Sequence, residues 1–148
     1  MDADRMLNIL LVEDDEIDVM NVRRAFKKNN ICNPLFTAGN GLEALEMLRS
    51  DQLPRDRRLV LLDLNMPKMN GIEFLREVRQ DPELRSTPVV VLTTSKGEED
   101  IVRTYDLGVN SFVSKPVTFE ELASVMRTLA CYWFDLVELP QEGSDGSA

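Results

Sequence analysis

Five apolar runs alternate with helical patterns along most of this chain, and this alternation is the feature that most restricts its possible folds. The runs predict strands at Leu7–Val12, Leu35–Ala38, Leu59–Leu62, Pro88–Leu92 and Ser111–Ser114. The first, third and fourth are almost entirely apolar, which is typical of strands that are covered on both faces. Such strands separated by helices predict an α/β fold, a doubly wound five-stranded parallel sheet with flanking helices.

Apolar residues with helical spacing lie between these runs. They predict helices at about Glu16–Lys28, Gly41–Arg49, Gly71–Arg79 and Lys96–Leu107, and a last helix from near Phe119. In the first of these, an imperfect apolar face is formed by Ile17, Met20, Val22 and Phe26. The helices therefore have the amphipathic character needed to cover a sheet.

Capping patterns support the predicted helix starts. At four of them, an Asn, Ser or Thr precedes a glutamate by three residues: Asn40, Asn70, Ser95 and Thr118. The oxygen of such a side chain accepts a hydrogen bond from a backbone N–H that the first turn leaves unpaired. We expect Asp15 to cap the first helix in the same way.

The length and charge of the chain exclude several classes of protein. With 148 residues it fits one domain, and no apolar run approaches the roughly 20 residues of a membrane-spanning helix. The first six residues do not resemble a secretory signal, so we expect a cytoplasmic protein that does not bind membranes. The net charge of −9 repels phosphate groups and argues against a nucleic-acid partner.

The cysteine and histidine counts limit the chemistry. The two cysteines, Cys32 and Cys131, have no metal-binding spacing, and we expect two buried or partly buried free thiols. The chain has no histidine, which excludes histidine-based acid–base catalysis and imidazole metal sites. Any metal must therefore be a hard cation bound by oxygen atoms.

Charged and polar residues follow the predicted strands at their carboxyl ends: Glu13, Asp14, Asp63, Thr93 and Lys115. Each alone has a simpler explanation, as a helix cap, a turn residue, a strand-end hydroxyl or a solvated charge. In a parallel sheet, however, these ends meet at one edge, where α/β proteins bind their ligands. Three carboxylates, a hydroxyl and an ammonium together suit a divalent cation and a phosphoryl group, and a carboxylate can itself be a phosphorylation nucleophile.

Four strings carry a family resemblance: Leu-Val-Glu13-Asp14-Asp15, Leu-Leu-Asp63-Leu-Asn-Met-Pro-x-Met-Asn-Gly71, Val-Leu-Thr93-Thr-Ser and Phe112-Val-Ser-Lys115-Pro116. Together they resemble the receiver domains of response regulators, over roughly Leu7 to Ala130. The resemblance implies a flavodoxin-like receiver with strand order 2-1-3-4-5. It also implies that Asp63 accepts a phosphoryl group from a phosphohistidine of a partner kinase.

The resemblance further implies a magnesium site. Asp14 and Asp63 would bind Mg²⁺ through their side chains and Asn65 through its backbone carbonyl, while Glu13 would hold a metal-bound water. Mn²⁺ is a possible substitute.

Three other residues would respond to the phosphoryl group, and Pro116 would follow one of them. Lys115 would pair with it, Thr93 would move its hydroxyl towards it, and Phe112, where the family often has tyrosine, would change rotamer. The bond between Lys115 and Pro116 is expected to be cis.

A narrower resemblance concerns the partner. The string Leu-Thr93-Thr-Ser, the run from Arg103 to Asn110 and the Tyr-Trp-Phe…Leu-Pro ending are similar to small receivers that partner phytochrome-type histidine kinases in bacteria. No output domain follows, so we expect a single-domain regulator that acts through protein contacts or onward phosphotransfer.

The end of the chain is unusually apolar for a tail. We assign residues 1–140 to a single receiver domain that includes an extension at about 131–140, and residues 141–148 to a flexible tail. The extension either folds back on its own domain or, as we prefer, forms a homodimer with the face made by the fourth helix, the fifth strand and the fifth helix. The residues expected in this contact are Trp133, Phe134, Val137, Leu139 and Pro140.

Two alternatives use the same residues differently. A Mg²⁺-dependent phosphohydrolase would also form an aspartyl-phosphate, but such enzymes typically have a second Asp two residues after the nucleophile, where this chain has Asn65. A receiver-like adaptor that is never phosphorylated is the other alternative. We expect no enzyme activity beyond self-phosphorylation from a phosphodonor and self-dephosphorylation.

Overall fold

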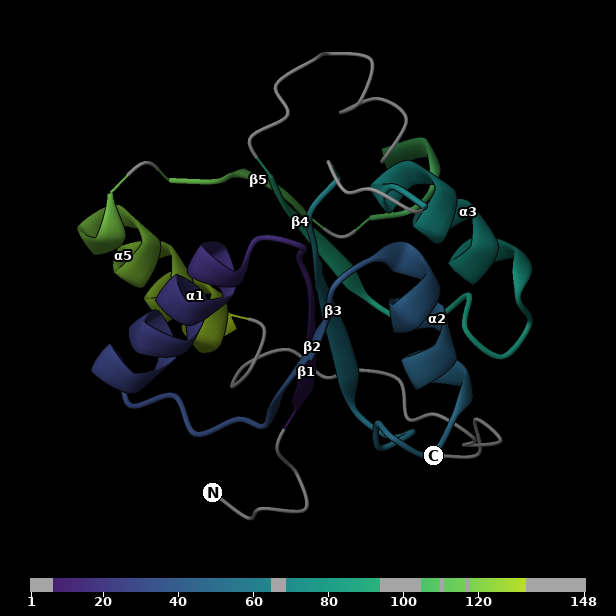
Figure 1. Cartoon of the computed structure of the whole chain (residues 1–148), viewed down its shortest axis with the longest axis horizontal. Helices are drawn as coiled ribbons and strands as arrows, with labels where there is room; N and C mark the ends of the chain where they lie inside the picture. The colour runs from purple at the N-terminus through teal and green to yellow at the C-terminus, as the bar shows by residue number, and fades with distance from the viewer. Residues whose placement is uncertain (1–6, 65–68, 94–104, 110, 117, 133–148) are drawn as a thin grey trace.

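The fold was obtained as a computed structural model, which describes residues 7–64, 69–93, 105–109, 111–116 and 118–132 (Figure 1). In chain order its elements are β1 (Asn8–Val12), α1 (Glu16–Lys28), β2 (Leu35–Ala38), α2 (Gly41–Arg49), β3 (Arg58–Leu62), α3 (Gly71–Gln80), β4 (Val89–Thr93), β5 (Ser111–Ser114) and α5 (Phe119–Leu129). Most of the helix predicted at Lys96–Leu107 lies outside the described residues. None of the helices in the described part of the chain has the length and apolarity to cross a membrane.

The five strands form one parallel sheet with the order β2-β1-β3-β4-β5. In the middle of β1, Leu10 pairs with Phe36 of β2 on one side and with Val60 of β3 on the other. The predicted doubly wound fold and strand order are therefore confirmed. Because the chain winds in opposite directions from β1, the carboxyl ends of β1 and β3 flank the point where such folds bind ligands.

Helices cover both faces of the sheet. Helices α1 and α5 lie on one face, and α2 and α3 lie on the other (Figure 1). Side chains alternate along a strand, so Ile9 and Leu11 of β1 pack in the α1/α5 layer, whereas Leu10 and Val12 pack in the α2/α3 layer. Each fully buried aliphatic side chain contributes about 1.5–3 kcal/mol to stability, which explains why nearly continuous apolar runs become central strands.

Helix α1 buries a narrower face than its sequence predicts. Val22, Ala25 and Phe26 are buried, but Ile17 is 68% exposed and Met20 is 60% exposed. The prediction that these two residues belong to the buried face was wrong, because the side of α1 that faces the sheet and α5 is the side carrying residues 22, 25 and 26.

Polar contacts fix α1 against α5 as well. The side-chain amide of Asn29 donates to the carbonyl of Ala123 at 2.8 Å. The guanidinium carbon of Arg24 lies 4.3 Å from the centre of the Phe119 ring, an attractive cation–π geometry. These contacts hold together the two helices on one face of the sheet.

Helix caps lie where the sequence predicts them. Asp15 accepts hydrogen bonds from the backbone N–H groups of Ile17 and Asp18. Asn40 and Thr118 cap α2 and α5, and Asn70 forms a reciprocal capping box with the third residue of α3. The cap predicted at Ser95 lies outside the described residues.

Arg79 joins its own helix, α3, to two other backbone segments, residues 85–87 and 107–108. Its guanidinium donates to the carbonyl oxygens of Leu107 at 2.7 Å and of Gly108, Thr87 and Arg85 at 2.9 Å each. Burial lowers the pKa of the Arg79 guanidinium, but a guanidinium keeps its charge in proteins. The chain that leads into β5 is thereby anchored to α3.

Both cysteine side chains are exposed. The expectation of buried or partly buried thiols was therefore wrong. Cys32 lies in the connection between α1 and β2, and Cys131 lies just beyond α5, where neither helical layer covers them. The two thiols are free, with no disulfide.

Candidate functional site

The carboxyl edge of the sheet collects the residues that the sequence singles out: Glu13, Asp14, Asp63, Thr93 and Lys115. Backbone hydrogen bonds between neighbouring strands set their relative positions. The N–H of Asp63 donates to the carbonyl of Val12 at 3.0 Å, and the N–H of Lys115 donates to the carbonyl of Thr93 at 2.8 Å. The sheet register therefore places these side chains together.

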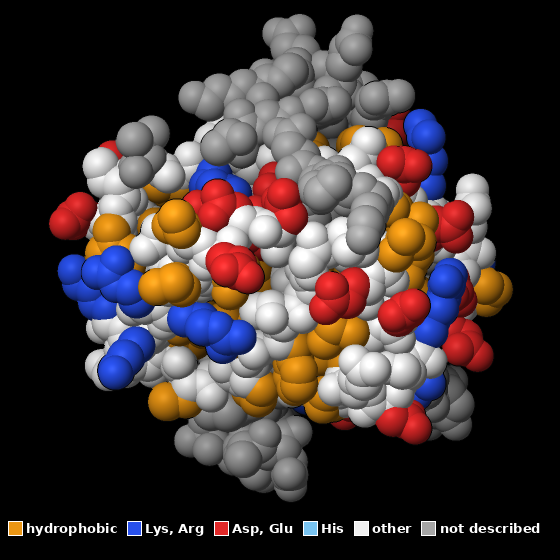
Figure 2. Space-filling model, in the orientation of Figure 1, with side chains coloured by type: hydrophobic (Ala, Val, Ile, Leu, Met, Phe, Trp, Pro, Cys, Tyr) orange, Lys and Arg blue, Asp and Glu red, His pale blue; other side chains and the backbone are white. Residues whose placement is uncertain are grey.

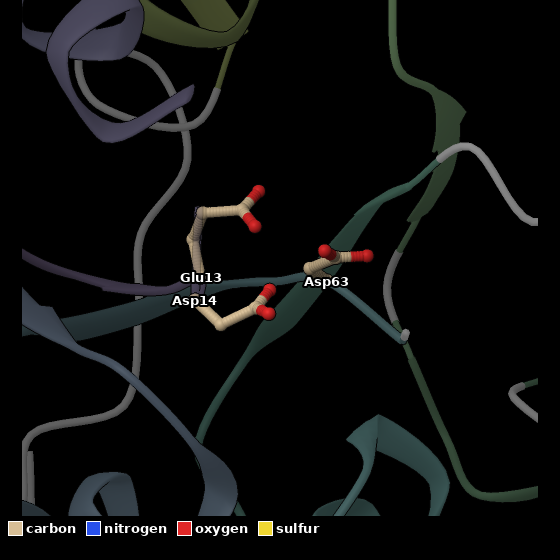
Figure 3. A group of neighbouring side chains, drawn as sticks. All are labelled: Glu13, Asp14 and Asp63. Carbon is tan, nitrogen blue, oxygen red and sulfur yellow. The ribbon is translucent and has the colours of Figure 1, made fainter. Parts of the chain in front are cut away.

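Three carboxylates lie close to one another at this edge. One oxygen each of Glu13, Asp14 and Asp63 lies within 4.8 Å of the others. Figure 3 shows the side chains of Glu13 and Asp14 leaving the end of β1 and pointing towards the side on which Asp63 lies. Opposite ligands of one Mg²⁺ are roughly 4.2 Å apart, so the cluster has the donor type and nearly the spacing of a site for a small divalent cation.

Asp63 contacts both the hydroxyl and the ammonium of the site. Thr93 Oγ1 donates a hydrogen bond to Asp63 Oδ1 at 2.7 Å, and Lys115 Nζ lies 3.6 Å from Asp63 Oδ2. The aspartate is 6% exposed and the threonine is completely buried. A largely desolvated carboxylate beside a cation is a suitable place for negative charge to build up in a reaction.

Lys115 also contacts two acids on the α1 side of the site. Its ammonium pairs with Glu13 Oε1 and lies 3.0 Å from Asp18 Oδ2. Asp18, in the first turn of α1, was missed as a candidate from the sequence. The available signal was the acid-rich string Glu13-Asp14-Asp15-Glu16-Ile17-Asp18, which continues from the end of the first strand into the first turn of α1.

The pKa values reflect this mixture of burial and charge. Burial raises the pKa of Glu13 to about 7, opposed by its hydrogen bond to Lys115 and reinforced by the charge of Asp63. Burial alone lowers the pKa of Lys115, but its hydrogen bonds to Glu13 and Asp18 and the charge of Asp63 raise it well above the usual value. Lys115 is therefore the charged partner of the acids at neutral pH.

Glu13 has hydrogen bonds on both of its oxygens. Oε1 accepts from the Lys115 ammonium, and Oε2 accepts from the backbone N–H of Asp15 at 3.2 Å. With only 5% of the residue exposed, Glu13 is held by its neighbours rather than turned into solvent.

Helix α3 begins directly against the end of β3. The N–H of Gly71 donates to the carbonyl of Leu64 at 3.0 Å. A Cβ atom on Gly71 would lie 2.7 Å from Leu64 Cα and 2.8 Å from the carbonyl oxygen of Asp63. Glycine is required here by close packing against the backbone that carries Asp63.

The remaining predicted site residues have mixed outcomes. Phe112 of β5 is partly buried and packs against the core layer under α2 and α3. The bond between Lys115 and Pro116 is trans, so the expectation of a cis bond was wrong; trans is the form that most Xaa–Pro bonds favour. Asn65 and the predicted dimer residues Trp133, Phe134, Val137, Leu139 and Pro140 lie outside the described residues.

A family model identifies the class of protein that this fold and site define. The model of the response regulator receiver domain matches residues 9–127. The chain therefore belongs to the response regulator receiver domain family, whose members are generally signalling proteins of two-component systems rather than enzymes. This membership does not favour the phosphohydrolase alternative.

Similar proteins narrow the class. The response regulator Rcp1 of Synechocystis is 38% identical over 136 residues, which cover 89% of this chain and 92% of Rcp1. The phosphorylated cyanobacterial phytochrome response regulator RcpA has a crystal structure with a TM-score of 0.82 and 36% identity, covering 91% of this chain and 99% of that chain. The crystal structure of the Mn²⁺-bound form of Rcp1 has a TM-score of 0.79 and 37% identity, and the match covers 90% of this chain and 99% of that chain. The chain is therefore closely related to phytochrome response regulators.

Proposed function

We propose that this protein is a single-domain response regulator of the cytoplasm, which takes a phosphoryl group onto Asp63 from a partner histidine kinase. The observation that supports this most directly is the position of the buried Asp63 carboxylate, between the hydroxyl of Thr93 and the ammonium of Lys115. These 148 residues contain no histidine, which agrees with a phosphohistidine donor supplied by the proposed partner kinase.

The proposed transfer needs few groups from this chain. An Asp63 carboxylate oxygen forms a bond to phosphorus while the bond from phosphorus to the donor imidazole breaks, and the imidazole leaves with that electron pair. Self-dephosphorylation uses water instead. Its oxygen attacks phosphorus, the electron pair returns to the Asp63 carboxylate, and a water proton passes to the released phosphate.

The acidic cluster is proposed to hold Mg²⁺, with Mn²⁺ as a substitute. Asp14 and Asp63 would bind the ion through their side chains and Asn65 through its backbone carbonyl. Glu13 would act through a metal-bound water, which agrees with the hydrogen bonds already made by both of its oxygens. The ion would offset negative charge on the group being transferred.

The switch is proposed to use Thr93, Phe112 and Lys115. Phosphorylation adds about 1.5 to 2 negative charges at the strand edge. Lys115 would pair with the new group, Thr93 would move its hydroxyl from Asp63 to a phosphoryl oxygen, and Phe112 would follow with a new rotamer. Pro116, directly after Lys115, would define the start of the β5–α5 connection. The altered surface would include the predicted fourth helix, β5 and α5.

The partner is proposed to be a phytochrome-type histidine kinase, since the similar proteins Rcp1 and RcpA include a phytochrome response regulator. We assign residues 1–140 to one receiver domain with a dimerisation extension at about 131–140, and residues 141–148 to a flexible tail. The output would be a protein contact or onward phosphotransfer. Dimerisation would use Trp133, Phe134, Val137, Leu139 and Pro140.

The experiment that tests the proposal is intact-protein mass spectrometry after incubation with acetyl phosphate and Mg²⁺. We expect one added phosphoryl group on the wild-type protein and none on Asp63→Asn, which keeps the fold but lacks the carboxylate nucleophile. The matched control is Asp51→Asn, because the Asp51 side chain is fully exposed in the α2–β3 loop. This control should label like the wild type.

Two outcomes would count against the assignment. Retained labelling of Asp63→Asn would move the phosphoryl acceptor elsewhere. A wild-type protein that neither takes a phosphoryl group nor binds Mg²⁺ would indicate an adaptor that is not phosphorylated.

A further inference from the structure

Asp18 provides the Lys115 ammonium with a partner that the proposed reaction does not need. Asp18 Oδ2 lies 3.0 Å from Lys115 Nζ, whereas Asp63 Oδ2 lies 3.6 Å from it. The first distance is within hydrogen-bonding range and the second is beyond it. In this structure the ammonium is therefore held closer to α1 than to the carboxylate that would carry a phosphoryl group.

The donors of Lys115 limit what it can bind at one time. An ammonium has three N–H donors, and Lys115 uses two of them in its hydrogen bonds to Glu13 and Asp18. A phosphoryl group on Asp63 would add strong acceptor oxygens on the β3 side of the ammonium and would draw the ammonium towards that side. Such a movement lengthens the contact with Asp18, since Asp18 is carried by α1 and Asp63 by the end of β3.

The side chain of Lys115 is not tightly packed on the side of α1. A cavity of about 80 Å³ lies between α1 and α5, and its lining includes Asp18, Asn21, Lys115 and Phe119. The lysine therefore borders open space on the α1 side rather than being locked by close packing. Its position depends on which oxygens attract the ammonium most strongly.

We propose that Asp18 is a positioning residue that competes with the phosphoryl group for Lys115. This inference rests on the proposed function of Asp63 as phosphoryl acceptor. Asp18 holds the ammonium towards α1 in the unphosphorylated protein, and phosphorylation draws it away. Asp18 thus weakens the hold of the site on a phosphoryl group and couples the occupancy of Asp63 to the first turn of α1.

The expected size of the effect follows from the exposure of the pair. The side chains of Lys115 and Asp18 are 14% and 34% exposed, so solvent screens their attraction only in part. Ion pairs of this kind change equilibria by about two- to five-fold. Neutralising Asp18 should therefore tighten the binding of a phosphoryl mimic by that factor.

The test measures the affinity of the full-length protein for beryllium trifluoride, a tetrahedral phosphoryl mimic, by calorimetry at fixed saturating Mg²⁺. Asp18→Asn should bind it about two- to five-fold more tightly than the wild type. Glu16→Gln is the matched control, because it removes one negative charge from the same turn of α1 at an exposed residue for which no contact with Lys115 is found. It should bind the mimic like the wild type.

A double-mutant cycle separates positioning from simple charge repulsion. If Asp18 acts through Lys115, then Asp18→Asn should have no effect on the affinity in a Lys115→Gln background. An equal gain in both backgrounds, or an equal gain from Glu16→Gln, would overturn the proposal. So would an unchanged affinity of Asp18→Asn in the wild-type background.

Failure of the proposed function would look different. If Asp63 is not a phosphoryl acceptor, the wild type would bind no mimic and take no phosphoryl group from acetyl phosphate. If only the role of Asp18 is wrong, the wild type and Asp18→Asn would both bind the mimic with the same affinity.

Discussion

At the scale of single residues, the strand-end site places like charges together. Asp14, Asp63 and Glu13 crowd within 4.8 Å, and the lysine that faces them is shared with Asp18. Figure 2 shows acidic side chains, in red, spread over the face of the molecule that is turned towards the viewer. Crowded carboxylates destabilise a fold unless a cation offsets their repulsion. Lys115 offsets part of this repulsion, and the part that remains should reduce stability until a metal binds.

Replacing Asp14 with Asn tests this relation between charge and stability. The change removes one carboxylate from the cluster and keeps its shape. We expect the metal-free variant to melt about 2–4 °C higher than the wild type, as the relief of roughly 1 kcal/mol of repulsion would give. Mg²⁺ should raise the melting temperature of the wild type by mass action and raise that of the variant much less.

Calorimetric scans with and without Mg²⁺ measure both effects. Glu16→Gln serves as the control, since Glu16 is an exposed neighbour outside the cluster and should leave the response to Mg²⁺ intact. An equal Mg²⁺-dependent shift in Asp14→Asn and the wild type would show that Asp14 does not bind the ion.

At the scale of elements, the start of α3 fixes the backbone that carries Asp63. Gly71 lies so close to Leu64 that there is no room for a side chain between the helix and the end of β3. The capping box at Asn70 fixes the same turn through its hydrogen bonds. The position of Asp63 thus depends on one helix start as much as on the sheet.

Gly71→Ala should therefore destabilise the protein and disturb the site. The added methyl group must displace backbone rather than a flexible side chain, at a cost of about 1–3 kcal/mol. Denaturant unfolding would measure this loss, and labelling by acetyl phosphate should slow. Gly39→Ala is the control, because its new Cβ would meet only a glutamate oxygen at 3.5 Å. A stable, normally labelled Gly71→Ala would contradict this view of the helix start.

A comparison of the predicted and observed strands and helices indicates how far the sequence determines the structure. The strands were predicted to within one residue of each end, because buried apolar runs and their burial energy are local properties. The orientation of α1 about its own axis was not predicted correctly. Ile17 and Met20 are exposed because of the way the whole helix packs on the sheet and on α5.

At the site, too, some contacts could be predicted from the sequence and others could not. The meeting of Asp63, Thr93 and Lys115 could be predicted, because parallel strands end on one edge. The contact of Asp18 with Lys115 could not, because it depends on where the first turn of α1 lies relative to a long side chain after β5.

At the scale of the whole molecule, the proposed homodimer depends on the C-terminal extension. Among the described residues, Tyr132 at the start of this extension is 55% exposed, and Tyr105, between β4 and β5, is 52% exposed. Exposed aromatic residues near a proposed contact face agree with a protein interface.

Sedimentation velocity over a range of concentrations tests the dimer, with and without phosphorylation. We expect dimers of the wild type and weaker association of a Trp133→Ala, Phe134→Ala double variant, because the apolar contact would shrink. Ile17→Ser is the control, as it removes an exposed apolar side chain from α1, outside the proposed face. A wild type that is monomeric at every concentration would rule out the homodimer.

The two exposed thiols affect every experiment that measures the oligomeric state of the protein. Cys32 and Cys131 follow the ends of α1 and α5 that point away from the strand edge carrying Asp63. In air, surface thiols of separate molecules can join covalently and imitate a native dimer. Reductant therefore belongs in the buffer. The same thiols are natural attachment points for paired fluorophores or spin labels, which would report how two copies approach each other without altering the site.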